Sequence, residues 1–254
     1  FGYYGGQLMH IVTWFIVFGW LFKEEGEALG GAQLFGPAYV PIVWFCCLLV
    51  AVTIFSCAWF TRNRIPYMNE APHDGEKFSP FRLFRDMWEA IQNRNYLFLL
   101  IGLFFLSVTI GTHETLSIYI YTFFWELSPF QIGFLAIANL IGFHLGFFFA
   151  SVAHKRFDKR WTIVVSAAGL SVFWSTAVTL GLLGFAPANS TLQLVVFIIF
   201  WSIFSSVFGS VLNISVMSAL ADITDEHEAK TGRRQEGIFY SARTFFAKTS
   251  NAIG

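Results

Sequence analysis

The chain has 254 residues, of which 56 % are hydrophobic and only 13 % are charged, whereas a soluble domain carries about 25 % charged residues. Its 16 basic and 16 acidic side chains cancel, so the net charge gives no indication of nucleic acid as a partner. This composition argues against a soluble domain and predicts an all-α integral membrane protein in a lipid bilayer.

Seven apolar segments are long enough to be predicted as membrane-spanning helices, because a span needs about 20 predominantly apolar residues. The chain begins with Phe1 and ends at Gly254, both inside such segments, so we expect a piece of a longer protein without a signal peptide. The predicted spans are 1–22, 38–60, 96–122, 130–153, 162–184, 191–220 and 237–254.

A long polar segment, 61–95, separates the second and third predicted spans. Its first half has Pro, Asn and Gly without periodicity, and its second half places apolar residues at helical spacing. We interpret it as a linker followed by an interfacial amphipathic helix, which marks a domain boundary. The apolar residues of this helix are Phe81, Phe84, Met87, Trp88 and Ile91.

Lys and Arg are distributed unequally between the connections. The segments 61–95, 154–161 and 221–236 hold thirteen of the 16 basic residues, and the opposite set of connections holds only Lys23. Because cytoplasmic loops of membrane proteins are enriched in Lys and Arg, these three segments are predicted to face the cytoplasm.

The third predicted span contains Glu114, an acidic residue well inside an apolar segment. This carboxylate could bind a cation, carry a proton or accept a hydroxyl of a substrate, or it could be a solvated residue near the outer face or a packing contact. Its neighbour His113 is interpreted as an ordinary packed or interfacial histidine. On a helix, Ser107, Gly111, Ser117 and Tyr121 share the face of Glu114.

Small and polar residues also follow one face of the fourth and sixth predicted spans. Gly142 and Gly146, with Asn139 nearby, form a spacing that is typical of close helix packing. In the sixth span the same interpretation applies to its hydroxyl residues, and Asn213 is the candidate ligand contact. This second stripe comprises Ser202, Ser206, Gly209, Ser210 and Asn213.

The last predicted span, 237–254, carries two cations and three polar groups on one helical face, opposite several phenylalanines. A charge at membrane depth costs about 2.5–3.5 kcal/mol on insertion scales, so it is expected to face water or a partner. Lys248 is therefore predicted to line a cavity, the alternative being a contact with a carboxylate of another helix. The polar face comprises Tyr240, Arg243, Thr244, Lys248 and Asn251.

Enzyme chemistry is not indicated. We find no Ser/His/Asp arrangement, no glycine-rich phosphate loop and no Cys/His metal set. Cys46, Cys47 and Cys57 lie in one apolar run and are interpreted as small apolar side chains. Several helices with polar faces in an apolar surrounding describe a solute pathway, so the sequence predicts a transporter.

Residues 221–248 read "ADITDEHEAKTGRRQEGIFYSARTFFAK". This segment resembles the signature of the glycoside–pentoside–hexuronide:cation symporters, the melibiose permease-like family of the major facilitator superfamily. The order of the spans and the long central loop agree with that family less distinctively. The matching residues are Ala221, Asp222, Asp225, Glu228, Lys230, Thr231, Gly232, Arg234, Glu236, Gly237, Tyr240, Ser241 and Lys248.

The resemblance implies two six-helix bundles, of which this chain would hold helices five to eleven of twelve. Residues 1–60 would then be the last two helices of the N-terminal bundle, 61–95 the central cytoplasmic linker, and 96–254 the C-terminal bundle without its last helix. The coupling cation, H⁺ or Na⁺, would bind mostly on helices upstream of this chain. No other cofactor and no metal site are implied.

The resemblance also implies roles for individual residues. Lys248 and Thr244 would line the central cavity, and Asp222, Asp225 and Arg234 would form a cytoplasmic charge network that closes the inner gate. Two residues depart from the family pattern. Asn213 stands where a sugar-stacking tryptophan is found, and Arg243 replaces a glutamine, which favours an anionic or otherwise different solute. The predicted substrate contacts are thus Lys248, Thr244, Tyr240, Arg243, Asn213 and Glu114.

These observations predict a secondary active transporter that carries a sugar, glycoside or sugar acid together with a cation by alternating access. A lipid or lysolipid transporter of the same superfamily is the alternative, because the many aromatic residues would suit an amphipathic solute. A membrane enzyme or receptor is a third possibility. The expected protein is a monomer that crosses the cell membrane, in a bacterium the inner membrane, several times.

Overall fold

The computed structural model describes residues 2–27, 29–67, 85, 88, 91–189, 191–231 and 236–251. These residues form helices joined by turns, and no strand occurs among them. The chain divides into two compact units, Phe1–Ser79 and Pro80–Gly254, and each is described here by itself. The predicted all-α fold class is confirmed, and the finer domain boundaries at 60 and 95 stay a prediction.

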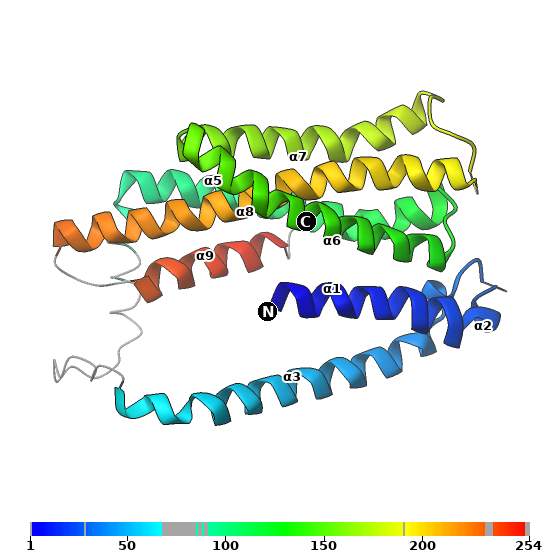
Figure 1. The fold of residues 1–254 in the computed structure, drawn as a ribbon, viewed down its shortest axis with the longest axis horizontal. Coiled ribbons are helices and arrows are strands. Elements are labelled where there is room, and N and C mark those ends of the chain that lie inside the picture. The colour runs from blue at the N-terminus through cyan, green and yellow to red at the C-terminus, as the bar shows by residue number, and fades with distance from the viewer. Residues whose placement is uncertain are drawn as a thin grey trace. The chain divides into compact units, whose positions relative to one another are not determined.

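The first unit consists of two long helical arms joined by short helices (Figure 1). The first arm consists of α1 and η1, so the chain changes there from an α-helix to a π-helix without interruption. The second arm, α3, has no buried residue. Gly30 and Gly31, with φ of 85° and 146°, permit the turn between the arms. The elements are α1 (Gly2–Val12), η1 (Thr13–Leu21), α2 (Lys23–Glu27), η2 (Ala32–Leu34), η3 (Gly36–Ala38), α3 (Tyr39–Thr61) and η4 (Arg62–Tyr67).

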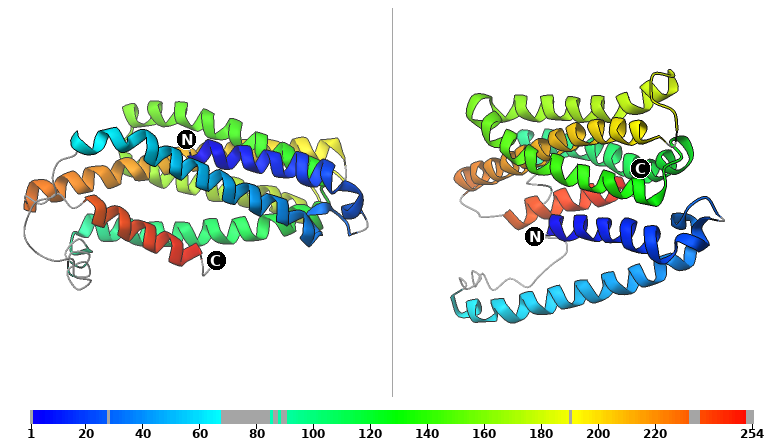
Figure 2. Two further views of the ribbon diagram at one scale, coloured as in Figure 1. Left: turned by 90° about the horizontal axis from the view of Figure 1, so that it is seen from below. Right: turned by 45° about the vertical axis from the view of Figure 1, so that its right-hand side comes forward.

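The second unit is a bundle in which α8 packs against both α6 and α7, and α5 packs against α9. Figures 1 and 2 show that α5, α7 and α9 run in one direction and α6 and α8 in the other. The elements are α5 (Arg94–Tyr119), the π-helix η5 (Ile120–Phe124), α6 (Pro129–Arg156), α7 (Lys159–Leu182), α8 (Leu192–Thr231) and α9 (Glu236–Asn251).

Local sequence signals explain where helices of this bundle begin. The Asn93 side chain accepts hydrogen bonds from the backbone N–H groups of Asn95 and Tyr96 and so caps α5. At α6, Ser128 and Gln131 form a reciprocal capping box, with Pro129 at the first helical position. Only 157 and 158 separate α6 from α7, so the predicted loop 154–161 is a tight turn between two helices.

Glycines bring α6 and α8 into close contact. A Cβ added at Gly142 would lie 2.4 Å from the Ile203 carbonyl oxygen, and one added at Gly146 would lie 2.4 Å from Ser210 Cβ. Nearby, the Ser206 hydroxyl donates a hydrogen bond of 3.0 Å to Asn139 Oδ1. The packing role predicted for this glycine pair is therefore confirmed.

Five helices are long and apolar enough to cross a membrane, judged by length and composition over the described residues: Gly36–Tyr67, Arg94–Phe124, Pro129–Arg156, Lys159–Leu182 and Leu192–Lys230. They correspond to the second to sixth predicted spans. The first span corresponds to a shorter apolar helix, Gly6–Leu21, and α9 has 16 residues. That these two helices also cross the membrane stays a prediction.

The prediction of a loop at 221–236 is wrong in its first part, because α8 continues to Thr231. Hydropathy marks the end of an apolar segment, but the Ala, Glu and Lys residues that follow favour helix, so the backbone remains helical. Of the amphipathic helix predicted within 61–95, all but 85, 88 and 91–95 lie outside the described residues.

Candidate functional site

At one end of the second unit α5, α7 and α9 begin and α6 and α8 end (Figure 1). Charged side chains of these helix ends lie close together there. We call this region the charged end. Since α8 has 40 residues, its length is about 60 Å, twice the thickness of the hydrocarbon core. The last turns of α8 can therefore carry acidic residues outside the apolar region.

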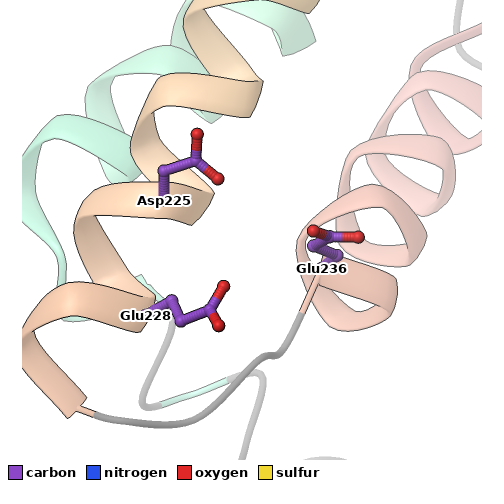
Figure 3. Close-up of side chains that lie close together, drawn as sticks. All are labelled: Asp225, Glu228 and Glu236. Carbon is purple, nitrogen blue, oxygen red and sulfur yellow. The ribbon is translucent and has the colours of Figure 1, made fainter. Parts of the chain in front are cut away.

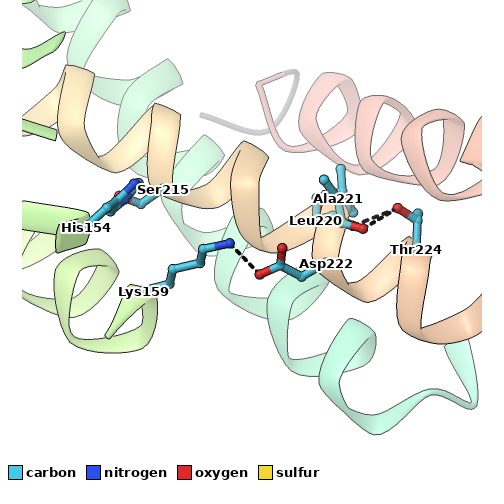
Figure 4. Close-up of polar contacts among 7 residues, drawn as sticks. All are labelled: His154, Lys159, Ser215, Leu220, Ala221, Asp222 and Thr224. Atoms are coloured by element: carbon cyan, nitrogen blue, oxygen red, sulfur yellow. Dashed lines mark hydrogen bonds and ion pairs between the residues drawn. The ribbon is translucent and has the colours of Figure 1, made fainter. Parts of the chain in front are cut away.

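An ion pair joins the start of α7 to α8 at the charged end (Figure 4). Lys159 Nζ lies 2.5 Å from Asp222 Oδ2, and the two side chains are 35 % and 60 % exposed. A pair this exposed contributes at most about 1 kcal/mol to stability, but it fixes where the Asp222 carboxylate points. The carboxylate predicted for the inner gate thus has a cationic partner within its own unit.

A second contact, between α6 and α8, lies beside this ion pair (Figure 4). The buried Ser215 hydroxyl donates to the Val211 carbonyl oxygen at 2.7 Å, which commits its only proton. Its oxygen lies 2.8 Å from His154 Nε2, so His154 must donate through an Nε2–H group. This bond attaches the end of α6 to α8.

Three carboxylates converge where α8 ends and α9 begins (Figure 3). Oxygen atoms of Asp225, Glu228 and Glu236 lie within 4.8 Å of one another. Asp225 is exposed and the other two are half-buried. Like charges at this distance repel, so the group favours a cation beside it. Arg234, which the resemblance assigns to the same gate, lies outside the described residues.

Glu226 points from α8 toward the start of α5. Its carboxylate pairs with Lys230 one turn along α8 and accepts a hydrogen bond of 3.4 Å from Asn95 Nδ2. Both contacts lie on the surface and are individually weak. Together they tie the polar extension of α8 to α5.

The start of α9 is anchored in a buried aromatic cluster. Tyr96 donates from its hydroxyl to the Phe239 carbonyl oxygen at 2.7 Å, and the two rings lie 4.4 Å apart. The His227 ring packs 5.0 Å from the same phenylalanine. Since Tyr96 and Phe239 are both fully buried, these contacts set the position of α9 on α5.

Beyond this anchor, α9 carries the polar residues that the sequence predicted. Tyr240 and Arg243 are half-buried, and Thr244 and Lys248 are exposed. The Thr244 hydroxyl donates to the Tyr240 carbonyl oxygen at 2.9 Å. Arg243 Nε is buried and has no hydrogen-bond partner among the described residues. An Nε–H group without such a partner can donate a hydrogen bond to an anion.

Glu114 and Asn213 are exposed on α5 and α8. Glu114 follows Tyr96 by about 27 Å of helix, whereas Lys248 follows Phe239 by only about 13 Å. Because Tyr96 contacts Phe239 and both helices run the same way, the structure does not bring Glu114 and Lys248 together. His113 stacks on Trp174 with 3.8 Å between ring centroids, which confirms its prediction as a packed histidine.

Sequence reasoning missed the partners of these residues. Lys159, His154 and Ser215 belong to no motif in the sequence, which predicts 154–161 only as a basic connection. Asp158, which takes extended backbone angles just before α7, is the kind of residue that starts a helix. This signal could have placed Lys159 in the first turn of α7.

A family model described as MFS/sugar transport protein matches residues 1–254, the whole chain. The comparisons with curated proteins and with solved structures find no match. The narrower resemblance to glycoside–pentoside–hexuronide:cation symporters stays a prediction. The chain belongs to the MFS/sugar transport protein family, whose members are membrane transporters of small solutes.

Proposed function

We propose that this protein is a secondary active transporter that carries a carbohydrate together with H⁺ or Na⁺ by alternating access. In this proposal the polar face of α9 contacts the solute, and the charged end closes the cytoplasmic side of the pathway. The protein would act as a monomer in the cell membrane, in a bacterium the inner membrane.

The observation that carries the proposal is the half-buried Arg243 on α9. Its Nε is buried without a hydrogen-bond partner in the described part of the chain. A half-buried cation is favoured by an approaching anion, and guanidinium binds carboxylates through two parallel hydrogen bonds. Arg243 therefore favours a sugar acid over a neutral sugar. The exposed Lys248, about 7.5 Å further along α9, would supply a second positive charge.

The charged end supports the gating part of the proposal. Lys159 holds Asp222 within the second unit, while Asp225 and Glu228 lie close together with Glu236. Mutual repulsion would make these carboxylates favour a cationic partner whenever the cytoplasmic side is closed. From the resemblance, Arg234 is the proposed partner. Separation of such pairs would accompany opening of the inner side.

The test is uptake by the full-length protein in proteoliposomes, with glucuronate and glucose compared under imposed H⁺ or Na⁺ gradients. Arg243→Gln should reduce uptake of the acid about tenfold or more and change glucose uptake little, because only the acid loses a charged hydrogen bond. Lys248→Ala should abolish uptake of both. Ser241→Ala, an exposed change on the same helix, is the control and should behave as wild type.

Two outcomes would contradict the proposal. Uptake that needs no cation gradient would exclude symport. Uptake of a lysolipid, with no transport of any sugar or sugar acid, would assign the chain to the alternative solute class. If Arg243→Gln lowered glucose and glucuronate uptake equally, the preference for an anionic solute would be wrong.

A further inference from the structure

One polar contact lies inside the first helical arm, away from the charged end. Trp14 Nε1 donates a hydrogen bond of 2.8 Å to His10 Nε2. An indole nitrogen can only donate, so His10 Nε2 must offer a lone pair. His10 is therefore a neutral imidazole whose proton sits on Nδ1. The Trp14 side chain is only 6 % exposed, whereas His10 is exposed.

A proton and the indole compete for the same lone pair. Binding of a proton at His10 Nε2 would place an N–H group against the Trp14 N–H group, which cannot form a hydrogen bond. Trp14 is buried, so its donor would reach water only if the ring moved. An unpaired buried donor is unfavourable, and protonation should therefore displace this ring.

Trp14 is the first of a series of ring contacts that ends at α3. It meets Phe18 edge to face at 5.2 Å, and Phe18 meets Tyr39, the first residue of α3, at 5.3 Å. The Tyr39 hydroxyl donates to the Gln33 carbonyl oxygen at 2.7 Å. Trp14 and Phe18 both belong to the π-helix η1, a rare conformation that is frequent at functional sites. Movement of Trp14 would thus reach the junction of the two arms.

No Asp, Glu, Lys or Arg occurs in α1 or η1, the two elements that form the first arm around His10. The residues one helical turn from His10 are Gly6, Gln7, Thr13 and Trp14, and all four are uncharged. Among the described residues of this unit, the charged ones lie in α2 (Lys23, Glu24, Glu25 and Glu27) and in η4 (Arg62 and Arg64).

We propose that His10 Nε2 is a proton-binding site whose occupancy displaces Trp14 and loosens the first arm from α3. Support for this proton-binding site comes from the geometry of the first arm and does not depend on the proposed function. Its use in transport, where it would make solute uptake depend on pH, rests on the proposed function.

The test is thermal unfolding of the full-length protein in detergent between about pH 8 and pH 5.5, a range that spans the titration of an ordinary imidazole. Over this range the melting temperature of the wild type should fall by roughly 3 °C more than that of His10→Gln. The melting temperature falls on acidification because only the neutral imidazole of His10 can accept the hydrogen bond from Trp14. Trp14→Phe keeps the ring but removes the donor, and it should abolish the same acid-dependent loss.

His144→Gln is the matched control. His144 lies exposed on α6, outside the first unit, and its Nδ1 lies 2.7 Å from the Leu140 carbonyl oxygen. The proposal is overturned if wild type and both first-arm variants show the same pH dependence, or if His144→Gln alone removes it. The measurement needs no solute, so a missing pH effect leaves the proposed transport untouched. Absence of uptake, conversely, would leave this site untouched.

Discussion

At the scale of single residues, the charged end is built from contacts between residues that lie far apart in sequence. Lys159 and Asp222 are 63 positions apart, and His154 and Ser215 are 61 apart. The first pair joins α8 to the start of α7 and the second joins α8 to the end of α6, so the Asp222 carboxylate is held by a second helix as well as by its own. The strength of these contacts is open to direct measurement.

We expect the Lys159–Asp222 pair to show a small coupling that depends on salt. Lys159→Gln and Asp222→Asn should each lower stability, and the double variant should lose less than the sum, with a coupling of about 0.2–1 kcal/mol. Thermal unfolding at low and high ionic strength measures it, and salt should reduce it. Lys155→Gln, on the exposed end of α6, is the control. Strict additivity at low salt would show that the pair contributes nothing.

At the scale of helices, two features set the bundle: close packing of α6 on α8, and the continuation of α8 past its apolar part. The close packing of α6 on α8 is possible because Gly142 and Gly146, which have no side chains, lie where the two helices are closest. Helices in a bilayer gain little from hydrophobic association, so such close contacts contribute much of their affinity.

Gly146→Ala should destabilise the bundle by about 1–3 kcal/mol, because its new methyl group would overlap Ser210. Gly102→Ala on α5 is the matched control: an added Cβ there has no neighbour within 4 Å, and alanine is the better helix former. Unfolding in denaturant or heat compares the two. Adding Ser210→Gly to the first variant should recover part of the loss; a loss that is equal in both alanine variants would contradict the packing explanation.

The apolar segments could be predicted from the sequence because hydrophobic length is a local property. The prediction placed α6 at 130–153 and α7 at 162–184, close to the observed helices. It is wrong at 221–231, where the helix continues beyond its apolar residues. The cross-helix partners of Asp222 and Ser215 could not be predicted, since they depend on how α6, α7 and α8 pack, and a single helix does not encode its rotation toward a neighbour.

At the scale of the whole molecule, the distribution of basic residues predicts that the charged end faces the cytoplasm. Lys230 lies at this end, at the last turn of α8, and Leu183 lies at the opposite end, after α7. Both side chains are well exposed. They are therefore suitable positions for a test of orientation.

With Cys46, Cys47 and Cys57 replaced by serine, Leu183→Cys should react with a membrane-impermeant thiol reagent added to intact cells, and Lys230→Cys should react only after the cells are opened. Labelling followed by gel analysis measures this. The reverse pattern would contradict the orientation, and labelling of both positions from outside would show that the membrane was leaky.

The continuous length of α8 has a mechanical consequence. The helix is unbroken from Leu192 to Thr231, so its two ends cannot shift independently. Pivoting by about 10° around its midpoint would swing the terminal carboxylates through roughly 5 Å, given a half-length of about 30 Å. That travel exceeds the reach of an ion pair. A modest tilt of one rod would be enough to make or break contacts on the far side of the membrane.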